Sequence, residues 1–229
     1  MTGSNRNNAD AWGLPGVLDF FTRRRATTDE VYASEWLFLK DRLTEGVSVL
    51  DVGCAQGGFA SILGEHLDTF AYTGVDINAE MIARARDRHP GHTFHHVEEG
   101  TFELPATAKF DLVLVLGILH LHESWRETLT RAWAHTCGTL IFDIREKAGP
   151  TLEDKSRSYF KMDFNSDDAS HAETTLPYII VNSGEALACT LECCPDASHV
   201  QRYGYQHPTS DSAVTSVENV MASVYCIER

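Results

Sequence analysis

Short apolar runs alternate with helical patterns from residue 47 to residue 144 of this chain. The most apolar run is FDLVLVLG at residues 110–117, which ends in a glycine. A strand that is buried on both faces has a continuous apolar run, and strands that alternate with helices form βαβ units. Because βαβ units place parallel strands side by side with helices on both faces, the alternation predicts a Rossmann-like α/β fold with a mostly parallel sheet.

Turn residues and helix caps give approximate bounds to the predicted elements. The predicted strands are residues 47–53, 71–76, 92–97, 110–117 and 138–144, followed by two closing strands at 199–205 and 220–227. The predicted helices are residues 28–43, 57–67, 78–89, 123–135 and 183–194. These elements fit a single domain, because domains commonly have about 100–200 residues and the chain has 229.

Two stretches of the chain lack a clear period. Residues 1–27 are polar at the start and then broken by Gly13 and Pro15, so we expect a flexible arm and cap there. Residues 28–229 are expected to form the domain, with an insertion at about 146–182. Long irregular segments are commonly functional, so we expect a substrate lid, with a mobile surface insertion as the alternative. Some apolar side chains here are expected to wall a small substrate or to pack on the sheet edge: Tyr159, Phe160, Met162, Phe164 and Tyr178.

The charge balance of the chain restricts its partners. The formal net charge is −14, from 19 basic and 33 acidic side chains, whereas nucleic-acid binders usually carry a basic surface. No apolar stretch reaches the roughly 20 residues that span a bilayer, and the first residues lack a signal-peptide pattern. We therefore expect a cytoplasmic protein with a small-molecule substrate and no nucleic-acid or membrane partner, and a homodimer is left open. The six cysteines contain no CxxC pair and are expected to be free thiols.

A glycine-rich turn follows the first predicted strand in the run VLDVGCAQGGF. Glycines let a backbone turn sharply and approach a ligand, and a helix that begins after them offers N–H groups to an anion. Asp76, at the end of the second strand, is placed to accept both hydroxyls of a ribose. Gly53, Ala55 and Gly58 give a G-x-G-x-x-G dinucleotide pattern with one glycine missing, but Asp51 would repel a pyrophosphate. Its carboxylate suits a ligand with an ammonium group, such as an amino acid moiety.

Three motifs occur in order along the chain: VLDVGCAQGGFA, GVDIN and FDLVLVLGILHL. Together they resemble the class I S-adenosylmethionine-dependent methyltransferases, and the resemblance covers about residues 30–145. It implies a seven-stranded sheet with one antiparallel strand, with which the two late strands are compatible, and S-adenosylmethionine as the cofactor. The sequence departs from the family at Ala55, where the family often has glycine.

The resemblance also implies which residues hold the cofactor. The residues expected at its methionine end are Asp51, Gly53, Ala55 and Gly57. Those expected at the ribose and adenine are Asp76, Ile77, Glu99 and Gly100. Those expected beside the sulfonium are Leu116, Gly117 and Ile118.

Methyl transfer needs a nucleophile that is held in line with the sulfonium, at about 3–3.5 Å. A hydroxyl nucleophile must also lose its proton to a side chain. His120, just after the fourth strand, is the candidate general base, with a structural role as the alternative, and His122 is a second choice. Arg145 is a candidate clamp for an acidic group of the substrate, with a surface salt bridge as the alternative.

We therefore expect an S-adenosylmethionine-dependent methyltransferase that acts on a small molecule. The expected acceptor is a hydroxyl of a biosynthetic metabolite or sugar-like compound, a choice that rests on the breadth of the family, since a fold does not give a substrate. Two alternatives stay open: a protein that binds the cofactor without methylating or uses it for other chemistry, and a nicotinamide-dependent oxidoreductase. No metal site is expected, because His92, His95 and His96 have no carboxylates at metal spacing.

Overall fold

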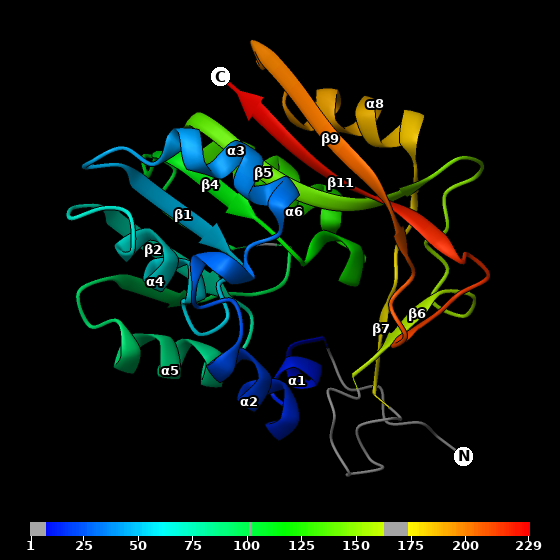
Figure 1. Ribbon diagram of the computed structural model, residues 1–229, viewed down its shortest axis with the longest axis horizontal. Coiled ribbons are helices and arrows are strands. Elements are labelled where there is room, and N and C mark those ends of the chain that lie inside the picture. Colours follow the sequence, from blue (N-terminus) through cyan, green and yellow to red (C-terminus); the bar gives the residue numbers. More distant parts are fainter. Residues whose placement is uncertain (1–7, 101, 163–173) are drawn as a thin grey trace.

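The structure is a computed structural model that describes residues 8–100, 102–162 and 174–229. It contains an eight-stranded main sheet, seven of whose strands lie in one row (Figure 1). These strands are β1 (Ser48–Val52), β2 (Ala71–Asp76), β3 (Thr93–His96), β4 (Phe110–Val115), β5 (Thr136–Lys147), β9 (His199–Pro208) and β11 (Asn219–Glu228). Their order is β3-β2-β1-β4-β5-β11-β9, and the short strand β8 (Val181–Asn182) pairs with the end of β5.

Strand direction follows the predicted pattern. The pairs from β3 to β5 are parallel, whereas β11 is antiparallel to both of its neighbours, β5 and β9. The prediction of a mostly parallel α/β sheet with one antiparallel strand is therefore confirmed. Because the parallel strands point the same way, their carboxyl ends meet at one edge of the sheet.

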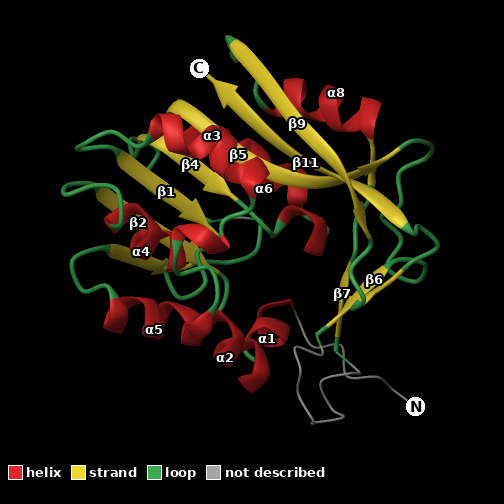
Figure 2. Ribbon diagram, viewed as in Figure 1, coloured by secondary structure: helices red, strands yellow, loops and turns green. Residues whose placement is uncertain are grey.

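Helices cover both faces of the main sheet (Figure 2). They are α3 (Ala33–Leu39), α4 (Gly58–Gly64), α5 (Ala79–Arg88), α6 (Trp125–His135) and α8 (Ser183–Cys193). On one face α6 and α8 bury Trp125 and Cys189 against Phe142 of β5. On the other face α3 and α4 bury Phe38 and Ile62 against the sheet. The two hydrophobic cores fix the central strands, and with them the edge at which the strands end.

Local capping signals explain why several bounds were predictable. Helix α5 begins directly after Asn78, whose side chain accepts a hydrogen bond from Met81 N at 2.9 Å. This contact satisfies one of the free N–H groups of the first turn. Strand β2 has the predicted bounds. Strand β9 extends to Pro208 because its antiparallel pairing with β11 continues that far, and β5 extends at both ends, where Thr136 pairs with β4 and Glu146 pairs with β11.

The helix predicted at residues 28–43 was wrong in part. The structure divides this stretch into the 3₁₀ helix η1 (Thr28–Glu30), α3, and the 3₁₀ helix η2 (Lys40–Arg42). Tyr32 is extended, with φ −62° and ψ 140°, so the chain cannot continue helically through it. The carboxylate of Glu35 accepts a hydrogen bond from Tyr32 N at 3.3 Å and restarts the helix.

The expected arm and cap contains two short helices, α1 (Asn8–Trp12) and α2 (Pro15–Arg23). They pack on a second, three-stranded sheet of β6 (Tyr159–Lys161), β7 (Thr175–Pro177) and β10 (Ala213–Val214), in the order β10-β6-β7. In this contact, Leu14 at the start of α2 and Val17 within α2 are buried together with Met162, Leu176 and Tyr178. The predicted insertion is thus structured at both ends, and its residues 163–173, which include Phe164, lie outside the described residues. Its role as a lid stays a prediction.

No helix in the described part of the chain is long and apolar enough to cross a membrane. The six cysteines are all unpaired, as predicted, and all but Cys137 are buried.

Candidate functional site

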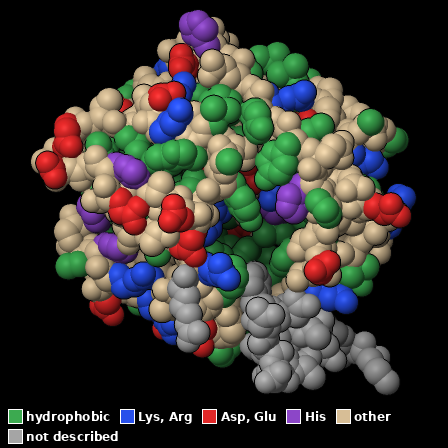
Figure 3. Space-filling view, viewed as in Figure 1, with side chains coloured by type: hydrophobic (Ala, Val, Ile, Leu, Met, Phe, Trp, Pro, Cys, Tyr) green, Lys and Arg blue, Asp and Glu red, His purple; other side chains and the backbone are tan. Residues whose placement is uncertain are grey.

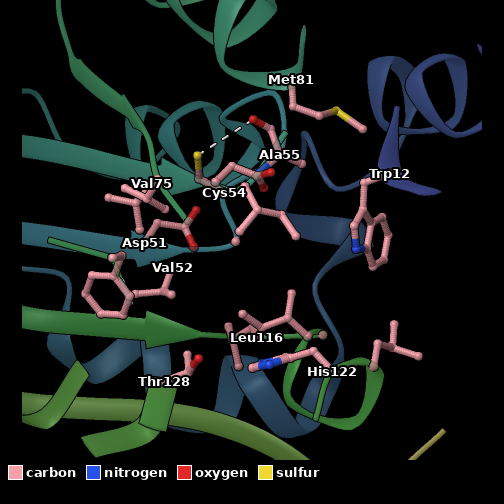
Figure 4. A pocket seen from close by; sticks show the side chains of 18 of the residues that line it. Trp12, Asp51, Val52, Cys54, Ala55, Val75, Met81, Leu116, His122 and Thr128 are labelled. Carbon is pink, nitrogen blue, oxygen red and sulfur yellow. Dashed lines mark hydrogen bonds between the residues drawn. The ribbon is translucent and has the colours of Figure 1, made fainter. Parts of the chain in front are cut away.

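A pocket opens at the carboxyl ends of β1, β2 and β4, with a volume of about 1100 Å³ that includes its open mouth. Figure 3 shows the surface of this face hollowed near its centre. Ligands of open α/β sheets bind at this edge, where loops follow the parallel strands. Figure 4 shows Asp51 and Val52 on one side of the pocket, Trp12 on the opposite side, and Leu116 and His122 below. Helices α1 and α2 therefore cover a site that the main sheet builds.

The glycine-rich turn adopts the left-handed conformations that the sequence suggests. Gly53 has φ +80°, and a Cβ there would lie 2.7 Å from a methyl carbon of Ile118. Ala55, at the position where the family often has glycine, also has a positive φ of 46°. This conformation costs an L-residue about 1–2 kcal/mol, and Ala55 N is held by a hydrogen bond of 2.9 Å to Asp76 Oδ2.

Asp76 ties the first two loops of the site together. Its Oδ2 accepts a hydrogen bond from Ala55 N, and its Oδ1 accepts one from Asn78 N at 2.8 Å. Burial raises the pKa of Asp76, and the two backbone donors oppose that rise. Each oxygen keeps a lone pair that can accept a further hydrogen bond from a ligand in the pocket.

Asp51 is the second buried carboxylate that lines the pocket. Its Oδ2 accepts a hydrogen bond from the hydroxyl of Tyr72 at 2.5 Å. Burial raises the pKa of Asp51 to about 7, while the Tyr72 hydrogen bond and the charge of Arg25 act in the opposite direction. Asp51 can therefore carry a negative charge at neutral pH, and a cation beside it would favour that charge.

The predicted cofactor residues are brought together around this pocket. Those that line it are Asp51, Gly53, Ala55, Asp76, Ile77, Glu99, Gly100, Leu116, Gly117 and Ile118. Gly57 does not line it: with φ +78° it caps α4, and a Cβ there would face His89 and Phe94. Its neighbour Gly58 lines the pocket instead.

The two histidines of the site lie in different surroundings. His122 lines the pocket, with Nδ1 at 3.5 Å from Glu99 Oε1, and burial lowers its pKa to about 4. His120 lies outside the pocket lining, packed edge-on against Tyr178 with ring centroids 5.8 Å apart. Burial and the charge of Arg145 lower the pKa of His120 to about 3. Both imidazoles are neutral at pH 7, and His120 does not face the pocket directly.

Arg145 is also outside the pocket lining and forms an ion pair of 2.7 Å with Asp143. Asp143 Oδ1 in turn accepts a hydrogen bond from Gly117 N at 2.5 Å. Arg145 is therefore joined to the pocket wall through one carboxylate rather than placed in the wall.

Sequence reasoning missed the residues that the N-terminal segment contributes to the pocket. They are Asn8, Trp12, Phe21, Arg24 and Arg25. Arg25 pairs with Glu35 at 2.5 Å, and its guanidinium lies 5.4 Å from the ring centroid of Phe59. Its buried Nε has no hydrogen-bond partner among the residues that the structure describes. The sequence signal that could have predicted them is the basic run Arg23-Arg24-Arg25, which directly follows the apolar segment expected to form the cap.

Comparison with known proteins agrees with this geometry. A family model described as a methyltransferase domain matches residues 50–139. Over 87 residues the chain is 38% identical to a fatty-acid O-methyltransferase of Mycolicibacterium smegmatis, covering 38% of this chain and 32% of that protein. Over 83 residues it is 32% identical to a trans-aconitate 2-methyltransferase of Rhodopseudomonas palustris, covering 36% of this chain and 30% of that protein. The chain thus spans about a third of the length of these relatives.

A solved structure with a similar fold covers the whole chain. It is a magnesium protoporphyrin IX methyltransferase of Synechocystis PCC 6803 with bound S-adenosylmethionine, which aligns over 100% of both chains. The TM-score is 0.58 and the sequence identity 14%, so this likeness concerns the fold.

Proposed function

We propose that the chain, in which a methyltransferase domain model matches residues 50–139, is a class I S-adenosylmethionine-dependent methyltransferase that methylates an oxygen of a small molecule. The cofactor supplies a methyl group that the positive sulfonium activates for transfer. The chain has to bind this cofactor, orient the acceptor and exclude water.

The charged groups of the pocket suit an amino acid moiety at one end. Asp51 offers a carboxylate for an ammonium group, and Arg25 offers a guanidinium for a carboxylate group. The unpartnered Nε of Arg25 is a buried donor that such a carboxylate would satisfy. At the next strand end, Asp76 lies where a ribose would present its two hydroxyls, and Ile77, Glu99 and Gly100 form the wall for the adenine.

The observation that carries this proposal is that Asp51 and Arg25 both line the pocket, near enough for the charge of Arg25 to oppose the rise in the pKa of Asp51. A dinucleotide would place a pyrophosphate against Asp51, which favours the methyltransferase over the nicotinamide oxidoreductase. A protein that binds the cofactor without methylating would have the same pocket, so turnover separates it from the proposed enzyme.

The relatives suggest small organic acids and related metabolites as acceptors, since the fatty-acid and the trans-aconitate methyltransferase are both named for an organic acid. The formal net charge of −14 also favours a small acceptor over a nucleic acid. We further propose that the described parts of the insertion, residues 146–162 and 174–182, cover the acceptor, because β6, β7 and Tyr178 pack against the helices that cover the pocket. Six unpaired cysteines suit a reducing compartment, which supports a cytoplasmic location.

Calorimetric titration of the purified chain with S-adenosylmethionine, S-adenosylhomocysteine and NADH tests the cofactor. We expect micromolar affinity for the two adenosyl compounds and no binding of NADH. Arg25→Met should weaken the binding of S-adenosylmethionine by about 10–100-fold, through loss of a charge-assisted hydrogen bond. Lys109→Met, which removes an exposed cation that bonds Ala134 O, is the matched control and should leave the affinity unchanged. Binding of NADH alone would establish the oxidoreductase instead.

A further inference from the structure

A second group of polar side chains lies beside the pocket, at the carboxyl end of β5. Asp143 and Arg145 are two residues apart in the strand and so lie on the same face of the sheet. Asp143 accepts hydrogen bonds from Gly117 N at 2.5 Å and from Arg145 Nη1 at 2.7 Å. Because Gly117 belongs to the pocket wall expected beside the sulfonium, Asp143 positions Arg145 next to the place where the methyl group would be transferred.

Arg25 reaches the same place from the other side. Its Nη1 lies 3.0 Å from the point where a Cβ of Gly117 would be, and its charge also interacts with Asp143. Tyr32 interacts electrostatically with both Arg25 and Arg145. Two guanidinium groups from distant parts of the sequence are therefore connected to Gly117, Arg25 directly and Arg145 through the carboxylate of Asp143. The side chain of Arg145 is 19% exposed and Tyr32 is 54% exposed, so a solute can approach this group of residues.

At this place Arg145 is charged and Tyr178 is neutral, and both lie near the ionised carboxylate of Asp143. The ion pair with Asp143 and the nearby Tyr178 raise the pKa of Arg145 against its burial, so the guanidinium stays charged. Burial raises the pKa of Tyr178, so its hydroxyl stays a hydrogen-bond donor at neutral pH. A charged guanidinium binds a carboxylate through parallel N–H···O hydrogen bonds, which makes arginine a specific carboxylate receptor.

The same surroundings offer poor general-base catalysis. The imidazole beside Arg145 is that of His120, whose pKa is lowered to about 3 by burial and by the charge of Arg145. A base is most effective when its pKa lies near the working pH, so His120 is poorly matched to take a proton from an alcohol. A carboxylic acid has lost its proton well below pH 7 and needs no base.

Apolar side chains surround the rest of this space. Phe160 stacks on Tyr178 with ring centroids 6.2 Å apart and an interplanar angle of 29°. Both belong to a hydrophobic cluster that also includes Trp12 and Phe21, which line the pocket. The cluster thus connects the neighbourhood of Arg145 with the pocket, and the side chains that it presents are apolar rather than charged.

We infer that the acceptor is a monocarboxylate with an apolar body, anchored by Arg145 and enclosed by Phe160, Trp12 and Phe21. This inference rests on the proposed function and replaces the expected hydroxyl acceptor with a carboxylate. A carboxylate oxygen forms the new bond to the methyl carbon while the carbon–sulfur bond breaks and its electron pair stays on sulfur. The products are a methyl ester and a neutral thioether, and no proton is transferred.

The test uses octanoate and 1-octanol, which share a carbon chain length and differ in the acceptor group. With the full chain and S-adenosylmethionine, we expect methyl octanoate and no octyl methyl ether, measured by mass spectrometry. Without turnover, calorimetry should show octanoate binding to the chain loaded with S-adenosylhomocysteine. Methylation of 1-octanol as fast as octanoate, or failure of octanoate to bind the loaded chain, would overturn the inference. If the chain methylated the tricarboxylate trans-aconitate faster than octanoate, the inference that the acceptor has an apolar body would be overturned.

Arg145→Gln identifies the anchor. We expect it to raise the Kd of octanoate by about 10–100-fold while the Kd of S-adenosylmethionine changes less than about 3-fold. Arg145→Lys keeps the charge but loses the planar pair of donors, so its Kd for octanoate should lie between that of the unmodified chain and that of Arg145→Gln. The matched control is Arg42→Gln, because Arg42 also pairs with a carboxylate, Glu228 at 2.7 Å, is 19% exposed like Arg145, and does not line the pocket. An unchanged Kd of octanoate in Arg145→Gln would refute the role of Arg145 as the anchor. Failure of the unmodified chain to bind S-adenosylmethionine would instead refute the proposed function.

Discussion

The hydroxyl of Tyr72 in β2 donates a hydrogen bond of 2.5 Å to the carboxylate of Asp51 in β1, and both side chains are buried. The two strands are neighbours in the parallel sheet, and of the two side chains Asp51 lines the pocket while Tyr72 supports it from outside the lining. Burial raises the pKa of Asp51 to about 7, and the hydrogen bond from Tyr72 limits that rise. The negative charge proposed to bind the cofactor is therefore gained or lost near neutral pH.

The affinity for S-adenosylmethionine should rise as the pH increases from 5.5 to 7. An ammonium group binds ionised Asp51 and lowers its pKa in the complex, so binding below about pH 7 releases a proton. We expect up to about a 10-fold gain per pH unit, measured by calorimetry in buffers of different ionisation enthalpy. Asp51→Asn should bind weakly and without this pH dependence, and the same slope in that variant would exclude Asp51 as its source.

Removal of the Tyr72 hydroxyl should shift this pH dependence. Tyr72→Phe deletes the hydrogen bond that favours ionised Asp51, so the pKa of Asp51 should rise and the midpoint of binding should move to higher pH. Tyr225→Phe is the matched control, because Tyr225 is also buried and donates to a carboxylate, Glu146 at 2.7 Å, but outside the pocket lining. A midpoint that stays in place in Tyr72→Phe would contradict the role of this hydrogen bond.

The raised pKa of Asp51 also has a cost for stability. The folded pKa is about 7 and the ordinary value is 3.8, so the stability that protonated Asp51 contributes is present below pH 3.8 and is lost as the pH rises through 7. Asp51→Asn, which removes the charge and keeps an acceptor for Tyr72, should stabilise the ligand-free chain at pH 8 by about 1–3 kcal/mol. Urea unfolding at pH 5 and pH 8 checks this, and an equal gain at both values would point to another cause.

Local signals explain how much of this fold the sequence could predict. Asn78 caps α5 through a contact three residues away, and Gly53 needs its left-handed φ whatever surrounds it. Such features depend on a few neighbouring residues, so the strands, the caps and the glycine-rich turn were predictable. The pocket residues at the three strand ends were predicted from the family resemblance, which rests on the same short motifs.

The remaining features depend on packing between distant segments. Arg25 lies in the site because α1 and α2 pack on the sheet formed by β6, β7 and β10. No local sequence pattern predicts this contact. The break at Tyr32 depends on Glu35, whose carboxylate is shared with Arg25. For His120 the sequence left open a general base or a structural role, and only the tertiary structure shows its side chain buried against Tyr178.

His120→Ala should leave both cofactor affinity and the pH profile of turnover nearly unchanged between pH 6 and 9. With a pKa of about 3, His120 does not change charge in this interval, and we expect turnover to fall less than about 10-fold. Thermal melting of the variant measures separately how much the cavity left beside Tyr178 lowers the free energy of unfolding, which we expect to be about 1–3 kcal/mol. A fall of about 10²–10⁴ with loss of a pH step near 6.5 would establish His120 as the general base.

Two glycines of the same helix should respond in opposite ways to alanine. A Cβ at Gly58 would lie 1.9 Å from the carbonyl oxygen of Arg25, whereas a Cβ at Gly64 would meet nothing within 4 Å. Since backbone cannot yield as a side chain does, Gly58→Ala must displace the connection that carries Arg25 and should weaken S-adenosylmethionine binding by about 10-fold or more. Gly64→Ala should stabilise the chain by about 0.5–1 kcal/mol, because alanine favours the helix, and leave binding unchanged. Calorimetry and thermal melting of both variants check this, and equal affinities would show that Arg25 can move without loss.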